Sequence, residues 1–291
     1  MSITAVGLVV LSGILHALWN LLTKQSRDRL AFLWWVLLIG CGMYLVPTLR
    51  WGEVQGFTPA ALPWAMAGGF CQAIYCLLLA AAYRHGDLSL VYPLSRGTAP
   101  IFIVLWATSF QGERVAPLGG LGIAAIVVGV YLMHLHCLTA EELLKPLRAW
   151  RDRATQLALL LGVSISLYHV IDNRGVELAP PFAYFYLMEC FVLLFLSGFI
   201  VFLRSWAQLR AEVRANWRAI AFVAVFYFLT YLLILFALTE AQVSYVGPAR
   251  NVSVVVATLF GVAILREPAA TPRLLGSTLI LSGLVLLAAS P

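Results

Sequence analysis

The chain has 291 residues, of which 62% are hydrophobic and 11% charged, and its formal net charge is +6. A water-soluble domain of this length needs far more charge on its surface, so the composition excludes one and predicts an integral membrane protein. The five cysteines lie in or beside apolar runs without the spacing of metal ligands. We therefore expect neither a disulfide framework nor a metal site.

Ten apolar runs, each near the roughly 20 residues that a bilayer requires, follow one another along the chain. They are continuously apolar, without the alternation of barrel strands, so each is predicted to be a transmembrane helix. No basic segment and cleavage site open the chain, so we expect the first run to remain as a span. The predicted spans are residues 3–22, 31–49, 62–82, 88–110, 116–135, 155–172, 181–203, 217–238, 242–264 and 271–289.

The positive charges gather on one side of this arrangement. Fourteen of the nineteen Lys and Arg residues lie in the loops after the odd-numbered spans, and three lie in the loops on the other face. The positive-inside rule places the odd loops in the cytoplasm and both termini on the external face of the cytoplasmic membrane. Because these basic groups are short loops that flank helices, no nucleic-acid partner is predicted.

The first and third spans carry polar residues that share a helical face. His16, Trp19 and Asn20 lie at spacings of three and four in the first span, and Gln72 and Tyr75 lie three apart in the third. Two readings of each group stay open. The side chains either form hydrogen bonds between packed helices or line a cavity that holds a ligand.

Two stretches carry the same pattern: LSLVYPLSRGTAPIFIVLWATSFQGE at residues 88–113 and QVSYVGPARNVSVVVATLFGVAILRE at residues 242–267. The offset is 155 residues up to the proline and 154 afterwards. The pattern therefore indicates an internal duplication. The matched residues are Ser89 with Ser244, Pro93 with Pro248, Arg96 with Arg250, and Glu113 with Glu267, followed by Gly122 with Gly276 and Gly129 with Gly283.

Arg96 and Arg250 lie inside segments that are apolar enough to cross a bilayer. An arginine near the centre of a span costs about 2.5–3.5 kcal/mol on insertion scales. Snorkelling toward the interface is one explanation, but two arginines at matching positions of a duplication favour a shared function. Arg96 shares a helical face with Tyr92, and Asn251 follows Arg250.

A proline precedes each of these arginines. Pro93 and Pro248 each lack a backbone donor and crowd the carbonyl four residues earlier, so a helix break is predicted at both. Transporters use broken helices near the bilayer interior to build substrate sites.

The second half contributes further polar and aromatic candidates. Tyr168 and Asp172 share a face of one span, Tyr186 lies on the same face as Glu189 in the next, and Tyr231 belongs to an aromatic face of the eighth. Glu189 is the acidic residue that lies well inside a span. It is either a titratable or cation-holding group or a buried partner for an arginine, and the two readings are compatible.

The duplication divides the chain into a first repeat at residues 1–136, a polar cytoplasmic connector at 137–154 and a second repeat at 155–291. Each repeat has five spans, an odd number, so the second copy enters the membrane from the opposite side. The expected fold is an all-α membrane protein with two inverted five-helix repeats. Such repeats place a site near the bilayer midplane and favour a carrier over a scaffold.

The opening HALWNLLTK, together with YPLSRGTAPIFIVLWATSFQGER and VGPARNVSVVVATLFGVAILREP, resembles the EamA-type members of the drug/metabolite transporter superfamily. The resemblance covers nearly the whole chain. It implies secondary transport of small metabolites through a cavity between the halves, coupled to protons or running as exchange. Many relatives are drawn with cytoplasmic termini, whereas the charge distribution of this chain favours external ones.

Two intramembrane arginines against one glutamate favour an anionic or zwitterionic substrate, because the guanidinium fork suits carboxylate, phosphate or phosphonate. We expect Arg96 or Arg250 to hold the acidic group, Glu189 to hold an amine or the coupling proton, and the tyrosines with Trp19 to shape the wall. Members with the HALWN-type opening are also similar to membrane proteins associated with phosphonate use, which hints at aminophosphonates beside amino acids.

Two alternatives stay open. A multidrug or quaternary-amine exporter would centre on Glu189 with an aromatic cage, and a non-transporting membrane subunit or lipid-handling protein would use the arginines as internal struts. An enzyme is not expected, because no nucleophile with a base, phosphate loop, metal constellation or cofactor motif is apparent. The expected partners are therefore the substrate, a coupling proton and the lipid bilayer.

Overall fold

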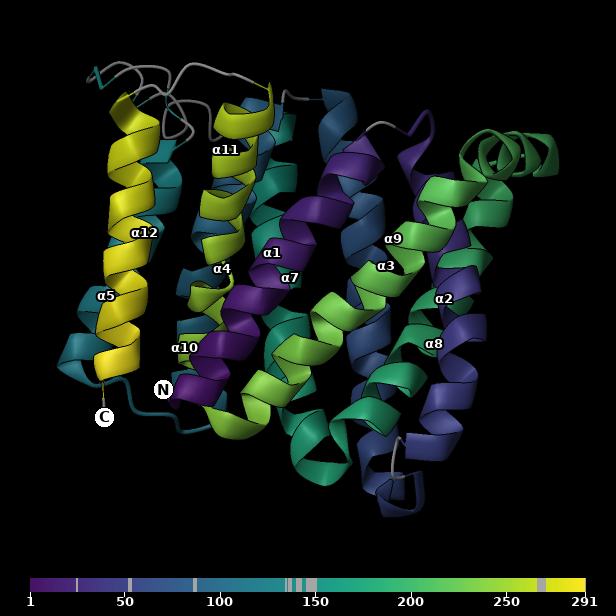
Figure 1. Ribbon diagram of the computed structural model, residues 1–291, viewed down its shortest axis with the longest axis horizontal. Helices are drawn as coiled ribbons and strands as arrows, with labels where there is room; N and C mark the ends of the chain where they lie inside the picture. Colours follow the sequence, from purple (N-terminus) through teal and green to yellow (C-terminus); the bar gives the residue numbers. More distant parts are fainter. Residues whose placement is uncertain are drawn as a thin grey trace.

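The computed structural model describes residues 1–24, 26–51, 54–85, 88–133, 135, 138–139, 143–144, 151–265 and 271–290, and Figure 1 shows a bundle of helices. Two short 3-10 turns, Val54–Gly56 and Pro59–Ala61, lie between the second and third helices. The α-helices are α1 (Ile3–Lys24), α2 (Arg29–Trp51), α3 (Leu62–His85), α4 (Leu88–Phe110), α5 (Pro117–Met133), α7 (Arg153–Leu178), α8 (Pro181–Leu203), α9 (Trp206–Glu240), α10 (Val243–Ala249), α11 (Val252–Leu265) and α12 (Thr271–Ala289).

Each predicted span is found as a helix in the described residues, and α10 and α11 together form the ninth. Six helices of the described chain are each long and apolar enough to cross a membrane, and α1 and α5 contain shorter apolar runs. The part of the chain that the structure describes is thus an all-α membrane protein, with ten helical segments at the predicted spans. Most of the predicted connector at residues 137–154 lies outside the described residues, so that boundary stays a prediction.

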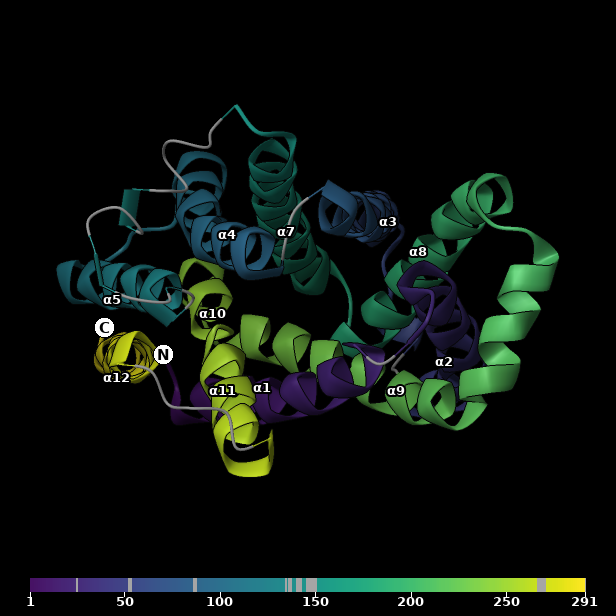
Figure 2. The ribbon, with the colours of Figure 1, turned by 90° about the horizontal axis from the view of Figure 1, so that it is seen from above.

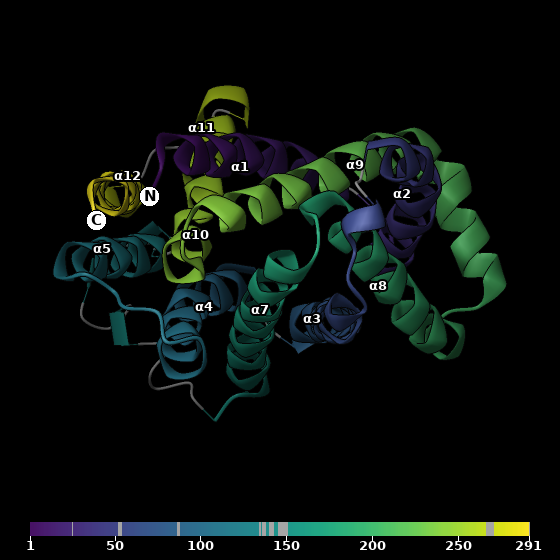
Figure 3. The same cartoon turned by 90° about the horizontal axis from the view of Figure 1, so that it is seen from below.

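The helix packing repeats itself when the two halves are exchanged. The first helix of one half packs against the third helix of the other: α1 against α9, and α7 against α3. The second helix of each half also packs against the third helix of the other, α2 against α9 and α8 against α3. Figures 2 and 3 show these pairs from both ends of the bundle, with α5 and α12 at one side and α2 and α8 at the other. This exchange symmetry is what a duplicated five-helix unit produces.

The contact between α5 and α12 shows that the duplication is inverted. The two helices run in opposite directions along their contact (Figure 1). A Cβ atom added to Gly122 would lie 2.8 Å from the carbonyl oxygen of Gly283, and one added to Gly129 would lie 2.7 Å from that of Gly276. The duplication matches Gly122 with Gly276 and Gly129 with Gly283, so each contact becomes the other when the halves are exchanged. Small residues let the backbones approach closely, as is common between membrane helices.

Helix α9 is longer than a bilayer requires. Its 35 residues span about 50 Å, and the backbone leaves the helical region at Asn216, where φ is −127° and ψ is 18°. The Asn216 amide donates to Glu212 Oε1 at 2.7 Å. The first part of α9 therefore turns aside at the edge of the bundle (Figure 2), and the span predicted from residue 217 begins next to this kink.

The two repeats differ at their fourth helices. In the second repeat, α10 ends at Ala249 and α11 begins at Val252, so Arg250 and Asn251 occupy the interruption that follows Pro248. In the first repeat, α4 is assigned as one helix from Leu88 to Phe110, so the break expected at Pro93 is not found. A proline removes one hydrogen bond and can bend a helix without ending it.

Glu113 has a structural role that explains its place after the first copy of the pattern. Its two carboxylate oxygens accept the backbone N–H groups of Val243 and Ser244, each at 3.0 Å, at the start of α10. A carboxylate suits a helix N-terminus because the first N–H groups there have no partner within the helix. The matching Glu267 lies outside the described residues.

Candidate substrate site

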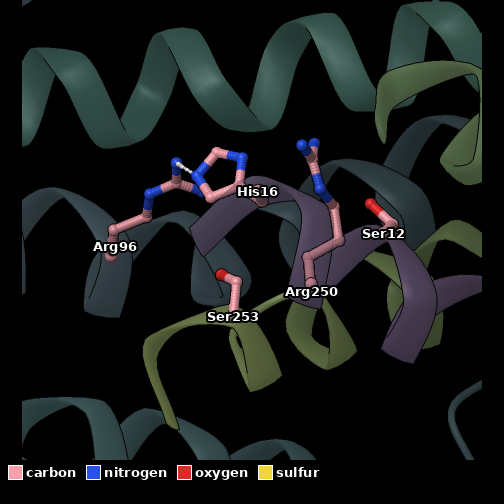
Figure 4. A pocket seen from close by; sticks show the side chains of 6 residues that line it. Ser12, His16, Arg96, Arg250 and Ser253 are labelled. Carbon is pink, nitrogen blue, oxygen red and sulfur yellow. Dashed lines mark hydrogen bonds between the residues drawn. The ribbon is translucent and has the colours of Figure 1, made fainter. Parts of the chain in front are cut away.

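A narrow pocket lies where the first helix of one half meets the fourth helices of both. It is lined by Ser12, Gly13 and His16 of α1, Arg96 of α4, Arg250 in the interruption, and Ser253 of α11. Figure 4 shows Arg96 and Arg250 on opposite sides of His16. The described lining therefore brings together two cationic side chains and holds no carboxylate. Both arginines were predicted from the sequence as site residues.

Gly13 sets how closely α1 approaches α11 at this pocket. A Cβ atom at Gly13 would lie 2.8 Å from Val252 Cγ1 and 3.2 Å from the backbone nitrogen of Ser253. The start of α11 can reach α1 only because this position has no side chain. Ser12, Gly13 and Ser253 were not among the sequence candidates, because nothing in a single small residue distinguishes a pocket wall from ordinary helix packing.

Each arginine contacts a histidine from the first helix of its own repeat. Arg96 Nη2 lies 3.3 Å from His16 Nε2, and Arg250 Nη1 lies 2.5 Å from His169 Nε2. His169 Nδ1 lies 2.7 Å from the carbonyl oxygen of Ile165. Because a carbonyl only accepts and a guanidinium only donates, His169 is a neutral ring with its hydrogen on Nδ1. It thus orients Arg250 without neutralising its charge.

The sequence contains a signal that matches His169 with His16. HALWN begins at His16 and HVIDN begins at His169, so a histidine is followed four residues later by an asparagine in the first helix of each repeat. The distance in sequence from His16 to His169 is one or two residues shorter than the offset that matches the two arginine stretches. An alignment of the two halves on their fourth helices does not match these two histidines, so it does not reveal His169 as a site residue.

Arg250 also contacts an aromatic ring that belongs to a hydrogen-bonded chain. Its guanidinium carbon lies 5.1 Å from the centre of the Tyr231 ring, an arrangement that favours a cation. The Tyr231 hydroxyl donates to Asp172 Oδ2 at 2.5 Å, and the Tyr184 hydroxyl donates to Asp172 Oδ1 at 2.7 Å. Asp172 is fully buried, and this chain joins its carboxyl group to the second arginine.

Several predicted aromatic residues surround the two arginine–histidine pairs. Trp19 packs edge-on against His16, with ring centres 4.8 Å apart. Tyr168 stacks on His169 at 4.5 Å and meets Tyr75 at 6.1 Å. These residues come from α1, α3 and α7, so the arginines lie among aromatic side chains from both halves.

Gln72 and Glu189 form a separate cluster. Gln72 Nε2 lies 3.2 Å from Glu189 Oε1 and 2.9 Å from the Tyr227 hydroxyl. Glu189 is fully buried, and its Oε2 atom has no hydrogen-bond partner among the described residues. The part of the chain that the structure describes contains no ion pair between Glu189 and an arginine. The reading of Glu189 as the buried partner of Arg96 or Arg250 is therefore not supported.

The remaining predicted residues lie apart from these contacts or cannot be placed. Tyr186 interacts with Cys190 one turn further along α8, and Asn251 is buried beside Arg250, with its backbone N–H bonded to the carbonyl of Pro248 at 3.0 Å. The side chains of Asn20, Tyr92 and Pro93 lie outside the described ones.

The inverted repeat and the charged interior site define a membrane transporter of the inverted-repeat class. The model of the EamA-like transporter family matches residues 3–135 and 153–289, one match for each half, and the chain belongs to this family. A solved structure titled "Crystal structure of protein" is similar over 99% of this chain and 98% of its own, with a TM-score of 0.75 and 17% sequence identity. At that identity the likeness concerns the fold. None of the curated proteins compared with the chain matches it.

Proposed function

We propose that this EamA-type transporter moves a small anionic or zwitterionic metabolite, such as an amino acid or an aminophosphonate, across the cytoplasmic membrane by alternating access. The observation that carries the proposal is the pocket that Arg96 and Arg250 line together without a carboxylate. An acidic group between two guanidinium groups would be bound by charge-assisted hydrogen bonds. A cationic ligand would be repelled by the two guanidinium groups that line the pocket.

A buried donor near the pocket supports the same substrate class. Trp19 is 9% exposed, and its indole Nε1 atom has no hydrogen-bond partner among the described residues. An unsatisfied buried donor is costly, and an acceptor oxygen of a bound anion would satisfy it. Trp19 already packs on His16, the partner of Arg96. The donor therefore lies next to the described pocket lining, which includes His16 but not Trp19.

The test is transport by the purified protein in proteoliposomes. Currents on a solid-supported membrane would be recorded for amino acids, aminophosphonates, organic anions and quaternary amines, each with and without a pH gradient. We expect responses to acidic or zwitterionic compounds, and counterflow of radiolabelled compound would detect electroneutral exchange. Responses to quaternary amines alone would favour the exporter, and silence in both assays would favour the non-transporting protein.

Arginine variants test the assignment of the site. Arg96→Ala and Arg250→Ala are each expected to reduce transport at least tenfold, because each removes a fixed charge at the acidic group. Arg174→Ala is the matched control, since Arg174 is half exposed and pairs with Glu177 at the C-terminal end of α7. Normal transport by both pocket variants would refute the site assignment.

We propose in addition that both termini lie outside the cytoplasm. They lie at the same end of the bundle (Figure 1), and most of the arginines and lysines lie in the loops of the opposite end. Alkaline phosphatase fused after residue 290 should be active and a fluorescent protein there should not fluoresce. In the loop at residues 26–28, the phosphatase fusion should be inactive and the fluorescent protein should fluoresce. If both sites gave the opposite readouts, the termini would lie in the cytoplasm.

A further inference from the structure

One buried acid is not explained by the arginine pocket. Glu189 lies in the middle of α8 with no exposed surface. One oxygen is bonded to the amide of Gln72 at 3.2 Å, and the other oxygen has no hydrogen-bond partner among the described residues. A charged carboxylate normally uses both oxygens as acceptors, so this environment suits the neutral acid.

Among the described side chains, the titratable groups that interact with Glu189 from the helices packed against α8 carry no positive charge. They are Cys41 on α2, Cys76 on α3, Asp172 on α7 and Tyr227 on α9, with Cys190 as its neighbour on α8. Of these groups, Asp172 is a second carboxylic acid. An ionised Glu189 would therefore be a buried charge without compensation.

Asp172 is a second buried carboxyl group, and its surroundings differ from those of Glu189. Both of its oxygens accept hydroxyl groups, from Tyr184 and Tyr231, and Arg250 lies over the ring of Tyr231. Glu189 has none of these features. The two buried acids of the second repeat thus have different environments, one suited to an anion and one suited to a protonated acid.

Glu189 is nevertheless connected to the pocket. The Gln72 amide also bonds to Tyr227, whose ring packs against Trp19 with centres 5.3 Å apart, and Trp19 packs on His16. Gln72 and Tyr227 lie on α3 and α9, the third helices of the two repeats. A movement of one repeat against the other would change the cluster and the pocket together.

We propose that Glu189 is the proton-binding site of this transporter, with a proton on its carboxyl group in the conformation described here. The coupling of that proton to substrate rests on the proposed transport function, whereas the binding of the proton does not. Release of the proton would follow when movement of the repeats exposes the acid to water.

Infrared spectroscopy of the purified protein tests proton binding without any substrate. Protein in deuterated buffer near neutral pH should show the C=O stretching band of a buried carboxylic acid. The band should be missing from Glu189→Gln, shifted in Glu189→Asp, and retained in Asp172→Asn and in the control Glu240→Gln, whose acid is exposed at the end of α9. An unchanged band in Glu189→Gln would overturn the proposal.

Transport by the same variants tests the coupling. With a compound that the wild type transports, Glu189→Gln should lose the response to an imposed pH gradient, whereas Glu189→Asp, which keeps a carboxyl group, and the exposed control Glu240→Gln should retain one. A full gradient response in Glu189→Gln would overturn the coupling role. If the wild type transports none of the compounds, the transport proposal fails, while the infrared result still decides whether Glu189 holds a proton.

Discussion

Arg250 and His169 are hydrogen-bonded within the second repeat although 81 residues separate them, and Arg96 and His16, 80 residues apart, form the corresponding pair in the first. The pairs join the fourth helix of each repeat to the first. Because the rings of such pairs accept from the guanidinium groups, each histidine holds its arginine in place. The duplication has therefore preserved an arginine–histidine pair in each repeat, and not the arginine alone.

The first prediction concerns the acceptor that His169 provides. His169→Leu should lower the stability of the purified protein by about 1–3 kcal/mol, because a partly buried donor of Arg250 loses its acceptor. His169→Gln, which keeps an acceptor, should recover part of the loss. Thermal unfolding in detergent measures both, with His85→Leu as the control, since His85 is exposed at the end of α3. A His169→Leu protein with the melting temperature of the wild type would show that the contact between Arg250 and His169 does not stabilise the fold.

Much of the architecture could be predicted from the sequence because a bilayer imposes simple rules. A helix needs about 20 apolar residues to cross it, so the spans could be counted, and the repeated arginine stretch indicated two halves. An odd number of spans in each half then required an inverted arrangement. The arginines could be placed together because matching positions of an inverted repeat meet near its axis.

The parts that could not be predicted depend on contacts between distant helices. Asp172 differs from Glu189 because it accepts hydrogen bonds from the hydroxyl groups of Tyr184 and Tyr231. The spacing of residues in the sequence does not reveal which helix faces supply these hydroxyl groups. The continuity of α4 across Pro93 likewise depends on packing, since proline allows either a bend or an end. The role of Gly13 in the approach of α11 to α1 is also invisible without the partner helix.

A second prediction concerns the space that Gly68 leaves for the Asp172 carboxyl group. A Cβ atom at Gly68 of α3 would lie 2.3 Å from Asp172 Oδ1, the atom that accepts the Tyr184 hydroxyl. Gly68→Ala should therefore displace the acid and cost about 1–3 kcal/mol, the usual range for overpacking a filled interior. Gly42→Ala is the control, because nothing lies within 4 Å of a Cβ atom there. Equal melting temperatures of the two variants would show that Asp172 can move freely.

A third prediction concerns the glycine contacts between α5 and α12. Gly122→Ala should destabilise the protein by about 1–3 kcal/mol, since its Cβ atom would meet the backbone oxygen of Gly283 at 2.8 Å, and a backbone cannot turn aside as a side chain can. Gly120→Ala on the same helix is the control, with its nearest atom at 3.9 Å. Thermal unfolding in detergent compares them, and tolerance of Gly122→Ala equal to that of Gly120→Ala would contradict this close approach.

A fourth prediction concerns the pH dependence of the junction before α2. Asp28 accepts the backbone N–H groups of Leu30 and Ala31 at 3.1 and 3.3 Å, and it pairs with Arg204 after α8. Burial alone would raise the pKa of Asp28, but the hydrogen bonds from Arg204 and Ala31 and the charge of Arg204 outweigh it and lower the pKa below 3.8. A lowered pKa in the folded state means that folding favours the ionised acid.

The stabilisation from Asp28 is therefore present above the unfolded pKa of about 3.9 and is lost as the pH falls through the lower folded value. Asp28→Asn should melt below the wild type near neutral pH, and the difference should shrink as the pH falls below about 4. Asp152→Asn is the matched control, because Asp152 precedes α7 without a capping hydrogen bond from its side chain. Melting curves recorded across this range measure the effect, and a difference between Asp28→Asn and wild type that stays constant with pH would show that the ionised carboxylate is not the stabilising species.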